Sequence, residues 1–288
     1  MNFRVGFHVS IAGGIENSVT RAKEIGCTAF QIFTRNPRGW AERKLVDTEI
    51  ESFKSSLKKS GIHNNSVVVH MPYLPNLSRP DSEIYDKSKA SFTNELIRCS
   101  RLGIEYLVIH LGSHQGQGKD NGTKQLLKSC DEAVDNYRST FKRKLNVTIL
   151  LENSAGQKDS IGSTLEDLRE ILDKLSSKTY GLCLDTCHAF ASGYDLKSPD
   201  ASNKFMDKFD NIVGLSVLKL IHLNDSKGDI GSHLDRHEHI GLGKIGIDGL
   251  SSILNMKPLK DLPIIMETPI DSIRDDSKNL EVVLNLRK

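Results

Sequence analysis

Short apolar runs of strand length recur eight times along the chain and alternate with longer amphipathic segments. Unbroken apolar runs are typical of strands covered on both faces, as in parallel sheets. The runs are RVGFH (4–8), TAFQIF (28–33), SVVVH (66–70), YLVIH (106–110), VTILLE (147–152), YGLCLD (180–185), LKLIH (218–222) and PIIME (263–267). Eight such strands, each followed by a helix, are what a closed (β/α)8 TIM barrel requires, and 288 residues suit one such barrel. An open doubly wound sheet is the alternative.

The segments between the runs have helical periodicity. Phe92, Leu96, Cys99 and Leu102 repeat at intervals of three and four residues, and the pattern ends at Gly103, a predicted C-cap. Leucines recur in the same way behind residues 163–166 (STLE), which fit a capping box that starts at Ser163. No linker or change of composition divides the chain, so we expect a single catalytic barrel domain over residues 1–288.

Composition and charge exclude several classes of protein. The hydrophobic content is 38% and the charged content 26%, as in an ordinary globular protein. No run approaches the roughly 20 apolar residues that span a bilayer, and the start of the chain lacks the layout of a signal peptide. The five cysteines form no C-x-x-C pair, which predicts buried thiols in a reducing, cytoplasmic setting. A net charge of +2 neither demands nor excludes an anionic partner.

The ends of the predicted strands carry the most informative side chains. In a barrel, all C-terminal strand ends open onto one face, where active sites are built. Seven of the eight runs end in a residue type that binds metals: His8, His70, His110, Glu152, Asp185, His222 and Glu267. Because residues from positions 8 to 267 would converge there, the sequence predicts a metal site at this face.

Two further pairs lie close to these strand ends. Asp185 and His188 are three residues apart, so a helical turn would put both on one face. Asp235 and His237 are two apart, so an extended backbone would point both the same way. The crowded segment 220–246 (LIHLNDSKGDIGSHLDRHEHIGLGKIG) is then the loop after the seventh strand, which returns to the site at this second pair.

The predicted ligands are imidazoles and carboxylates without thiolates, which suits zinc or manganese. They number nine when His8 is set aside: His70, His110, Glu152, Asp185, His188, His222, Asp235, His237 and Glu267. Nine ligands are enough for two or three ions, and such sites are typical of phosphoryl-transfer hydrolases. Four other histidines are interpreted as solvated or as outer residues of the site: His63, His114, His233 and His239.

Several motifs resemble the endonuclease IV family, the zinc-dependent apurinic/apyrimidinic (AP) endonucleases of base-excision repair. The resemblance extends from the first strand to the last. It rests on HVSIAGG (8–14), NPRGW (36–40), VVHMPYLPNLS (69–78), VIHLGSH (108–114), LLENSAGQ (150–157), CLDTCHAFASGYD (183–195), HLNDSKGDIGSHLDRHEHIGLGKIG (222–246) and METP (266–269).

The resemblance implies three zinc ions per chain, and the ligand types leave manganese possible at one site. Three ligand sets are implied: His70, His110 and Glu152 for the first ion; Glu152, Asp185, His222 and Glu267 for the second; His188, Asp235 and His237 for the third. It also implies DNA contacts on two loops at the rim of the site, and we assign them to Arg38, Trp40, Tyr73 and Leu74.

The implied reaction is hydrolysis of the phosphodiester 5′ to an abasic site in double-stranded DNA, leaving a 3′-hydroxyl and a 5′-deoxyribose phosphate. Glu267 and Glu152 are the expected catalytic carboxylates. We expect a monomer that has no membrane partner. The main alternative is a sugar isomerase or epimerase on a similar divalent-metal barrel. A catalytically silent binder of damaged DNA is a third hypothesis, although no ligand position is lost.

Overall fold

The computed structural model describes residues 3–142 and 144–288. Eight parallel strands form one sheet in the order β1-β10-β7-β6-β5-β4-β3-β2. Their bounds are Val5–Phe7 (β1), Phe30–Ile32 (β2), Val67–His70 (β3), Tyr106–His110 (β4), Thr148–Glu152 (β5), Tyr180–Asp185 (β6), Leu218–His222 (β7) and Ile264–Met266 (β10). Each lies within the apolar run that predicted it, and only the ends are trimmed.

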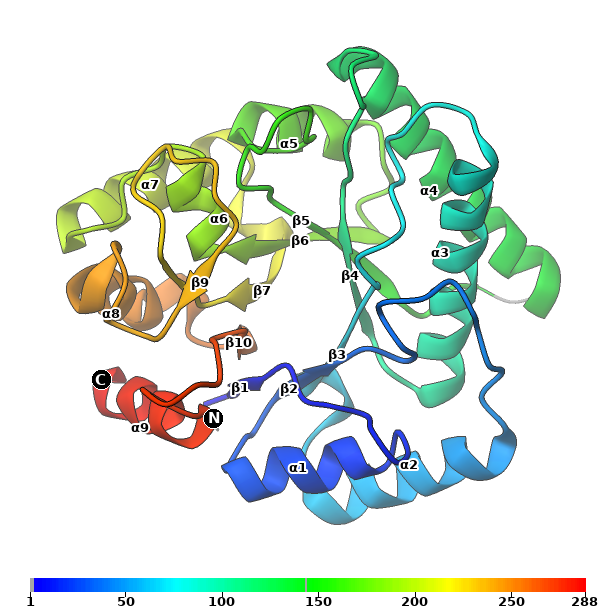
Figure 1. Cartoon of the computed structure of the whole chain (residues 1–288), viewed down its shortest axis with the longest axis horizontal. Helices are drawn as coiled ribbons and strands as arrows, with labels where there is room; N and C mark the ends of the chain where they lie inside the picture. Colours follow the sequence, from blue (N-terminus) through cyan, green and yellow to red (C-terminus); the bar gives the residue numbers. More distant parts are fainter. Residues whose placement is uncertain (1–2, 143) are drawn as a thin grey trace.

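The sheet closes on itself between β1 and β2. His8 and Gln31 form a parallel bridge there, and the backbone N–H of Val9 donates to the carbonyl of Gln31 at 2.8 Å. At the other end of these strands, the N–H of Thr28 donates to the carbonyl of Val5 at 2.9 Å. The predicted barrel is therefore confirmed, and the open doubly wound sheet is wrong (Figure 1).

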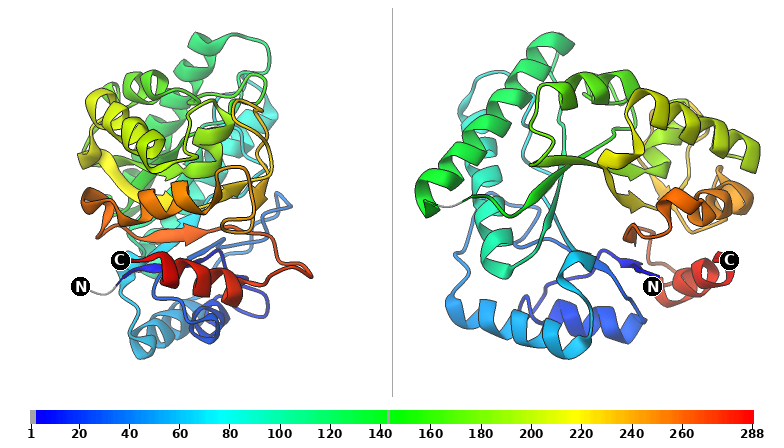
Figure 2. Two further views of the ribbon diagram at one scale, coloured as in Figure 1. Left: turned by 90° about the vertical axis from the view of Figure 1, so that its left-hand side faces the viewer. Right: turned by 180° about the vertical axis from the view of Figure 1, so that it is seen from behind.

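Helices surround the strands on the outside of the barrel (Figure 2). They are α1 (Asn17–Ile25), α2 (Asp47–Ser60), α3 (Glu83–Leu102), α4 (Lys119–Phe141), α5 (Leu165–Asp173), α6 (Thr186–Ala191), α7 (Pro199–Ile212), α8 (Gly246–Asn255) and α9 (Asp276–Leu286). Short 3-10 turns cover Asn64–Ser66, Leu215–Val217 and Lys257–Leu259. Along the described chain, none of the helices combines the length and the apolar character that crossing a membrane requires.

Two of the helix ends test the predicted caps. Helix α3 ends before Gly103, whose φ of 77° is the left-handed conformation expected of a C-cap. Helix α5 begins one residue later than predicted, because Thr164 rather than Ser163 is its N-cap. The Thr164 hydroxyl accepts the backbone N–H of Asp167 at 3.1 Å, and the Asp167 carboxylate pairs with Lys119. The capping box at residues 163–166 was therefore wrong.

Two apolar layers hold the barrel together. The larger one packs the strands against the helices. The smaller one fills the barrel interior with fully buried side chains from neighbouring strands: Ala29, Val68, Val108, Leu150, Cys183, Leu220 and Ile265. All five cysteines are buried and form no disulfide, as predicted.

Strand β1 contributes a glycine, Gly6, where it approaches the chain entering β2. A Cβ atom at this position would lie 1.8 Å from the carbonyl oxygen of Ala29 and 2.8 Å from the Cβ of Cys27. We expect Gly6→Ala to lower the free energy of unfolding by about 1–3 kcal/mol, because the strands must separate to admit the methyl group. Urea denaturation measures this. Gly39→Ala is the matched control, since no atom lies within 4 Å of its added Cβ. Equal stability of the two variants would contradict the close approach.

Candidate metal centre

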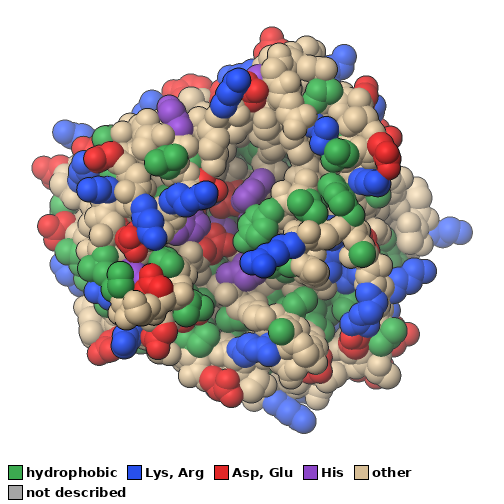
Figure 3. Space-filling view, in the orientation of Figure 1, with side chains coloured by type: hydrophobic (Ala, Val, Ile, Leu, Met, Phe, Trp, Pro, Cys, Tyr) green, Lys and Arg blue, Asp and Glu red, His purple; other side chains and the backbone are tan. Residues whose placement is uncertain are grey.

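The interior layer determines which side chains reach the C-terminal end of the barrel. Side chains two residues apart in a strand point to the same side. Each residue of the interior layer is followed, two positions later, by a polar residue: Gln31, His70, His110, Glu152, Asp185, His222 and Glu267. These side chains therefore face inward above the apolar layer. In the space-filling view, histidine and acidic side chains gather in a central hollow (Figure 3).

The first group of possible ligands comes from β3, β4 and β5. The Nε2 atoms of His70 and His110 lie 3.2 and 3.0 Å from the same oxygen, Oε2 of Glu152. His70 directs its other ring nitrogen, Nδ1, to the carbonyl of Met71 at 2.6 Å. The Nε2 of His70 is therefore the nitrogen left to bind a cation. One ligand atom from each of the three residues lies within 4.8 Å of the others, which is close enough to share an ion.

The second group adjoins the first through Glu152. Its Oε1 lies 2.9 Å from Nδ1 of His222, which is also 3.4 Å from Oε2 of Glu267 and 3.9 Å from Oδ2 of Asp185. These four residues again hold ligand atoms within 4.8 Å of one another. Because the two oxygens of Glu152 face different groups, this carboxylate is placed to bridge two ions.

The third group forms where α6 follows β6. The Asp185 carboxylate caps α6 by accepting the backbone N–H of His188 at 2.8 Å, so the predicted helical turn is confirmed. His188, His237 and Asp185 can share an ion. Asp235 was predicted in place of Asp185, and its Oδ1 lies 3.1 Å from Nε2 of His188 and 3.5 Å from Nε2 of His237. Both carboxylates therefore border this group.

A small hairpin positions Asp235 and His237. Strand β8 (Asp225–Ser226) pairs antiparallel with β9 (His237–Glu238), and this closes the crowded loop after β7. The buried Asp225 carboxylate accepts backbone N–H groups from Gly241 and Gly243, each at 3.0 Å. The glycine-rich segment thus wraps around one carboxylate, and the loop returns to the site as predicted.

The charges in the centre favour a bound cation. Burial alone would raise the pKa of Glu152, but His222 and His110 outweigh it and hold this pKa well below its usual range. Burial would lower the pKa of His222, but Cys183, Glu267 and Glu152 raise it well above its usual value. Without metal, the ionised carboxylates would therefore favour the protonated form of His222.

Two buried nitrogen atoms test whether metal ions fit. In the described residues, Nε2 of His188 and Nε2 of His237 have no hydrogen-bond partner. An unpaired buried polar atom is costly, and both nitrogens point toward carboxylate oxygens in the third group. Imidazole nitrogens and carboxylate oxygens are the donors that zinc prefers in catalytic sites. The residues present therefore fit a metal centre.

Three amides behind the ligands were missed by the sequence analysis. Asn153 accepts the backbone N–H of Asp185 at 2.7 Å and donates to its carbonyl at 3.0 Å. Asn224 donates to Oδ2 of Asp185 at 2.7 Å and accepts the N–H of Glu267 at 2.8 Å. Gln31 contacts Glu267 as well. Asn224 lies two residues beyond His222, so the period of two that places the ligands also marks this amide.

Two rim loops carry the predicted DNA contacts. Tyr73 is 60% exposed, and its ring centroid lies 6.3 Å from that of His70 at the mouth of the centre. Partial burial of the side chain, with Glu267 nearby, raises the pKa of Tyr73 to about 12. Leu74 is 39% exposed, Arg38 is exposed and Trp40 is half-buried. The structure thus leaves Tyr73, Leu74 and Arg38 accessible.

Arg35 holds the loop that carries Arg38 and Trp40. Its guanidinium donates to the carbonyl of Gly39 at 2.7 Å and to Oε1 of the buried Glu95 at 3.2 Å. A buried ion pair with Glu95 of helix α3 therefore fixes this loop against the barrel.

The histidines outside the ligand set differ in their surroundings. His239 was interpreted as solvated or as an outer residue of the site, but it is buried between Asp271 at 3.0 Å and Asn279 at 2.9 Å. It therefore joins its loop to α9. His8 lies beside Glu267, with its Nδ1 3.6 Å from Oε1 of that residue.

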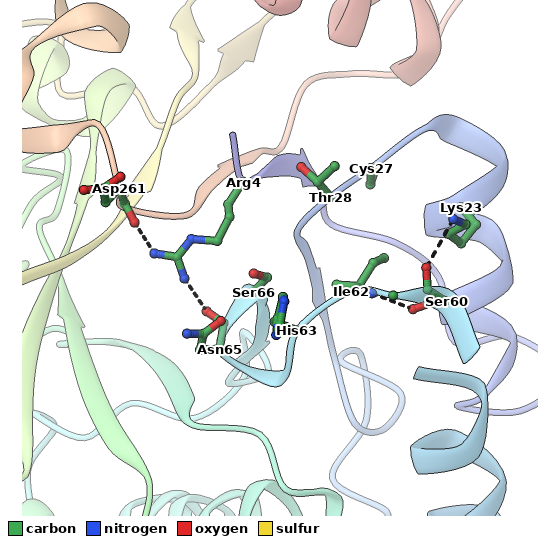
Figure 4. A pocket seen from close by; sticks show the side chains of 11 residues that line it. Arg4, Lys23, Cys27, Thr28, Ser60, Ile62, His63, Asn65, Ser66 and Asp261 are labelled. Atoms are coloured by element: carbon green, nitrogen blue, oxygen red, sulfur yellow. Dashed lines mark hydrogen bonds between the residues drawn. The ribbon is translucent and has the colours of Figure 1, made fainter. Parts of the chain in front are cut away.

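The exposed His63 lies at the opposite end of the barrel. It lines a pocket of about 450 Å³ with Arg4, Lys23 and Asp261, among others (Figure 4). Arg4 precedes β1 and Asp261 precedes β10, so this pocket opens at the N-terminal strand ends. The exposed His233 contacts the carbonyl of Ala155 at 3.2 Å, and the half-buried His114 lies 3.8 Å from Asp159.

Comparison with known proteins agrees with the class that fold and site define. A family model described as a xylose isomerase-like TIM barrel matches residues 19–286. The chain is 50% identical over 278 residues to a probable endonuclease 4 of Nitrosopumilus maritimus, with 96% of this chain and 97% of that protein covered. It is 47% identical over 283 residues to a probable endonuclease 4 of Methanoculleus marisnigri, with 98% of each covered.

Solved structures show the same relationship. The crystal structure of endonuclease IV from Thermus thermophilus superposes with a TM-score of 0.86 at 35% identity, covering 98% of both chains. A D-tagatose 3-epimerase-like protein reaches a TM-score of 0.74 at 20% identity, which shows a shared fold alone. The chain is thus a xylose isomerase-like TIM barrel. Within that class it belongs to the endonuclease IV family.

Proposed function

We propose that this chain is a DNA-repair hydrolase that cleaves the phosphodiester 5′ to apurinic/apyrimidinic sites in duplex DNA, leaving a 3′-hydroxyl and a 5′-deoxyribose phosphate. The observation that carries the proposal is the convergence of nine histidine, aspartate and glutamate side chains in three adjoining groups that share Glu152 and Asp185. The chain's place in the endonuclease IV family supports DNA as the substrate.

The metal content we propose is three zinc ions per chain, with manganese possible at one site. The first ion would be held by His70, His110 and Glu152, the second by Glu152, Asp185, His222 and Glu267, and the third by His188, His237 and Asp235, with Asp185 beside it. When bound, zinc lowers the pKa of coordinated water and neutralises phosphate oxygens. Three divalent ions would also more than offset the four carboxylates of the centre, so the mouth of the barrel would attract phosphate although the chain itself carries only +2.

The chain's own groups supply proton transfer and orientation. The Glu267 side chain is 18% exposed, so it reaches the opening of the centre while its backbone is held by Asn224. It is placed to orient the attacking water or take its proton. The Glu152 side chain is 1% exposed and lies beneath the opening between two groups. It would serve as a ligand in both groups.

Recognition of the abasic site is assigned to the rim. An enzyme that acts inside a duplex extrudes the target nucleotide, and aromatic or apolar side chains fill the gap. Tyr73, Leu74 and Arg38 are exposed on loops beside the mouth, and the half-buried Trp40 follows Arg38 on the same loop as a further DNA contact. The opening above the metal centre would admit a sugar without a base. Rim lysines and arginines would hold the DNA backbone without recognising sequence.

Tyr73→Ala is expected to weaken binding to abasic duplex by about 1–3 kcal/mol, the size of one lost stacking contact. Arg38→Ala should also weaken binding to the abasic duplex. Because neither side chain belongs to a group of possible metal ligands, the zinc content should stay at the wild-type value. Fluorescence anisotropy with an abasic duplex measures affinity, and elemental analysis of the same preparation measures zinc. Zinc loss in either variant would show that these loops are misassigned.

The proposed reaction is tested with a duplex that carries one abasic site and a label on each strand end. We expect nicking on the 5′ side of the site, no nicking of the intact duplex, and loss of activity after chelation. A sugar isomerase or epimerase would leave the DNA intact and convert a ketose. The solved epimerase-like neighbours support only the fold, at 20% identity or less. Binding without nicking would support the silent binder. The monomeric state and cytoplasmic location stay predictions.

A further inference from the structure

Gln31 is the residue of β2 that faces the metal centre. The apolar run that predicted this strand ends without a metal-binding residue. It is fully buried and makes three side-chain contacts. Its Nε2 lies 2.8 Å from Oε1 of Glu267 and 3.0 Å from Nδ1 of His8. Its Oε1 lies 2.9 Å from Nε2 of His222. One amide thus connects two members of the second ligand group.

The chemistry of the partners fixes the orientation of this amide. An ionised carboxylate only accepts hydrogen bonds, so the NH₂ group of Gln31 must face Glu267. The amide oxygen then faces Nε2 of His222 and requires a hydrogen on that nitrogen. In a neutral imidazole the second nitrogen is then free of hydrogen, and this is Nδ1, which faces the carboxylates of Glu152 and Glu267.

The other oriented histidines of the centre behave differently. His70, His188 and His237 place Nδ1 against backbone carbonyls, at 2.6, 2.9 and 3.1 Å respectively. Each therefore presents Nε2 to the centre. His222 presents Nδ1, and its outward nitrogen is held by a side chain instead of the backbone. The tautomer of His222 thus depends on the identity of residue 31.

We propose that Gln31 is a positioning residue that fixes the Nε2–H form of His222 and the direction of the Glu267 carboxylate, and thereby raises the affinity of the second ligand group for its metal ion. This inference rests on the proposed function, because it requires that the group binds metal. Partners that orient metal ligands typically contribute 10- to 100-fold to affinity.

The variant Gln31→Met keeps the length of the side chain and removes its donor and acceptor. Metal-free wild type and variant are titrated with zinc in competition with a chromogenic chelator. We expect one of three ions to bind about 10- to 100-fold more weakly in the variant, while the other two are unchanged. Gln125→Met, the same exchange on helix α4 away from the ligands, is the matched control and should bind zinc as the wild type does.

A spectroscopic readout separates positioning from a merely structural role. In ¹⁵N NMR of histidine-labelled, zinc-loaded wild type, His222 should carry its proton on Nε2, whereas His70, His188 and His237 carry theirs on Nδ1. In Gln31→Met the signals of His222 and of His8, the two histidines that Gln31 contacts, should move, whereas those of His70, His188 and His237 should not. This measurement on the wild type stands even if the variant does not fold.

A proton on Nδ1 of His222 in the wild type would overturn the inference, as would unchanged zinc affinity in Gln31→Met. Equal weakening of all three ions would assign Gln31 a structural role and overturn it too. Failure of the wild type itself to bind zinc would reject the proposed metal centre, so the two failures are distinguishable.

Discussion

Glu267→Gln is expected to slow single-turnover nicking of an abasic duplex by roughly 10²–10⁴-fold, the usual contribution of a general base. Glutamine keeps the size of the side chain and one acceptor oxygen but loses the charge and the basicity. The carboxylate also accepts the amide hydrogen of Gln31 at 2.8 Å and lies 3.4 Å from His222. The substitution therefore disturbs the ligand geometry as well, which would add to the loss.

Binding of the abasic duplex should survive in this variant, because the rim loops and most of the metal charge are untouched. Duplex affinity and zinc content are measured on the same preparation as the nicking rate. Nicking within tenfold of the wild-type rate would remove Glu267 from the catalytic residues. Affinity and zinc lost together would make it a structural ligand alone.

Glu152→Gln is expected to lose at least one zinc ion and to nick abasic duplex at least about 10²-fold more slowly. Residues that only hydrogen-bond to a metal ligand already contribute up to about 10²-fold to activity, and Glu152 is placed as a ligand itself. The two oxygens of this carboxylate lie 2.9 Å from His222, 3.0 Å from His110 and 3.2 Å from His70. An amide cannot offer two anionic oxygens to two ions. Zinc content and the single-turnover nicking rate are measured together.

The control for Glu152→Gln is Glu95→Gln, a change of the same kind at another fully buried glutamate. Glu95 pairs with Arg35 and accepts the hydroxyl of Thr34 at 2.6 Å, away from the metal centre. Its zinc content should match that of the wild type. Three tightly bound ions in Glu152→Gln would contradict the bridging position assigned to this carboxylate.

The sequence was sufficient to predict the barrel because its strands are covered on both faces and so stand out as apolar runs. It also predicted most of the metal centre. In six strands, the residue two positions after the interior layer is a histidine, aspartate or glutamate: His70, His110, Glu152, Asp185, His222 and Glu267. The predicted ligands on the strands were the last residues of the apolar runs. In β2 the inward position is Gln31, which two further apolar residues, Ile32 and Phe33, follow in the sequence.

Other features depend on contacts between distant parts of the chain. His239 looked solvated in a polar loop, but Asn279, 40 residues away, buries it against α9. The predicted third ligand set omitted Asp185, although its Oδ2 lies 3.6 Å from Nε2 of His237. The tautomer of His222 follows from an amide 191 positions earlier. Periodicity within a segment cannot predict which distant partner a side chain meets.

The most direct test of the account is elemental analysis of the purified chain combined with abasic-site nicking before and after chelation. We predict close to three zinc ions per chain, loss of nicking when they are removed, and recovery when zinc is restored. One ion or fewer per active chain, or nicking that survives complete removal of metal, would contradict the trinuclear zinc centre.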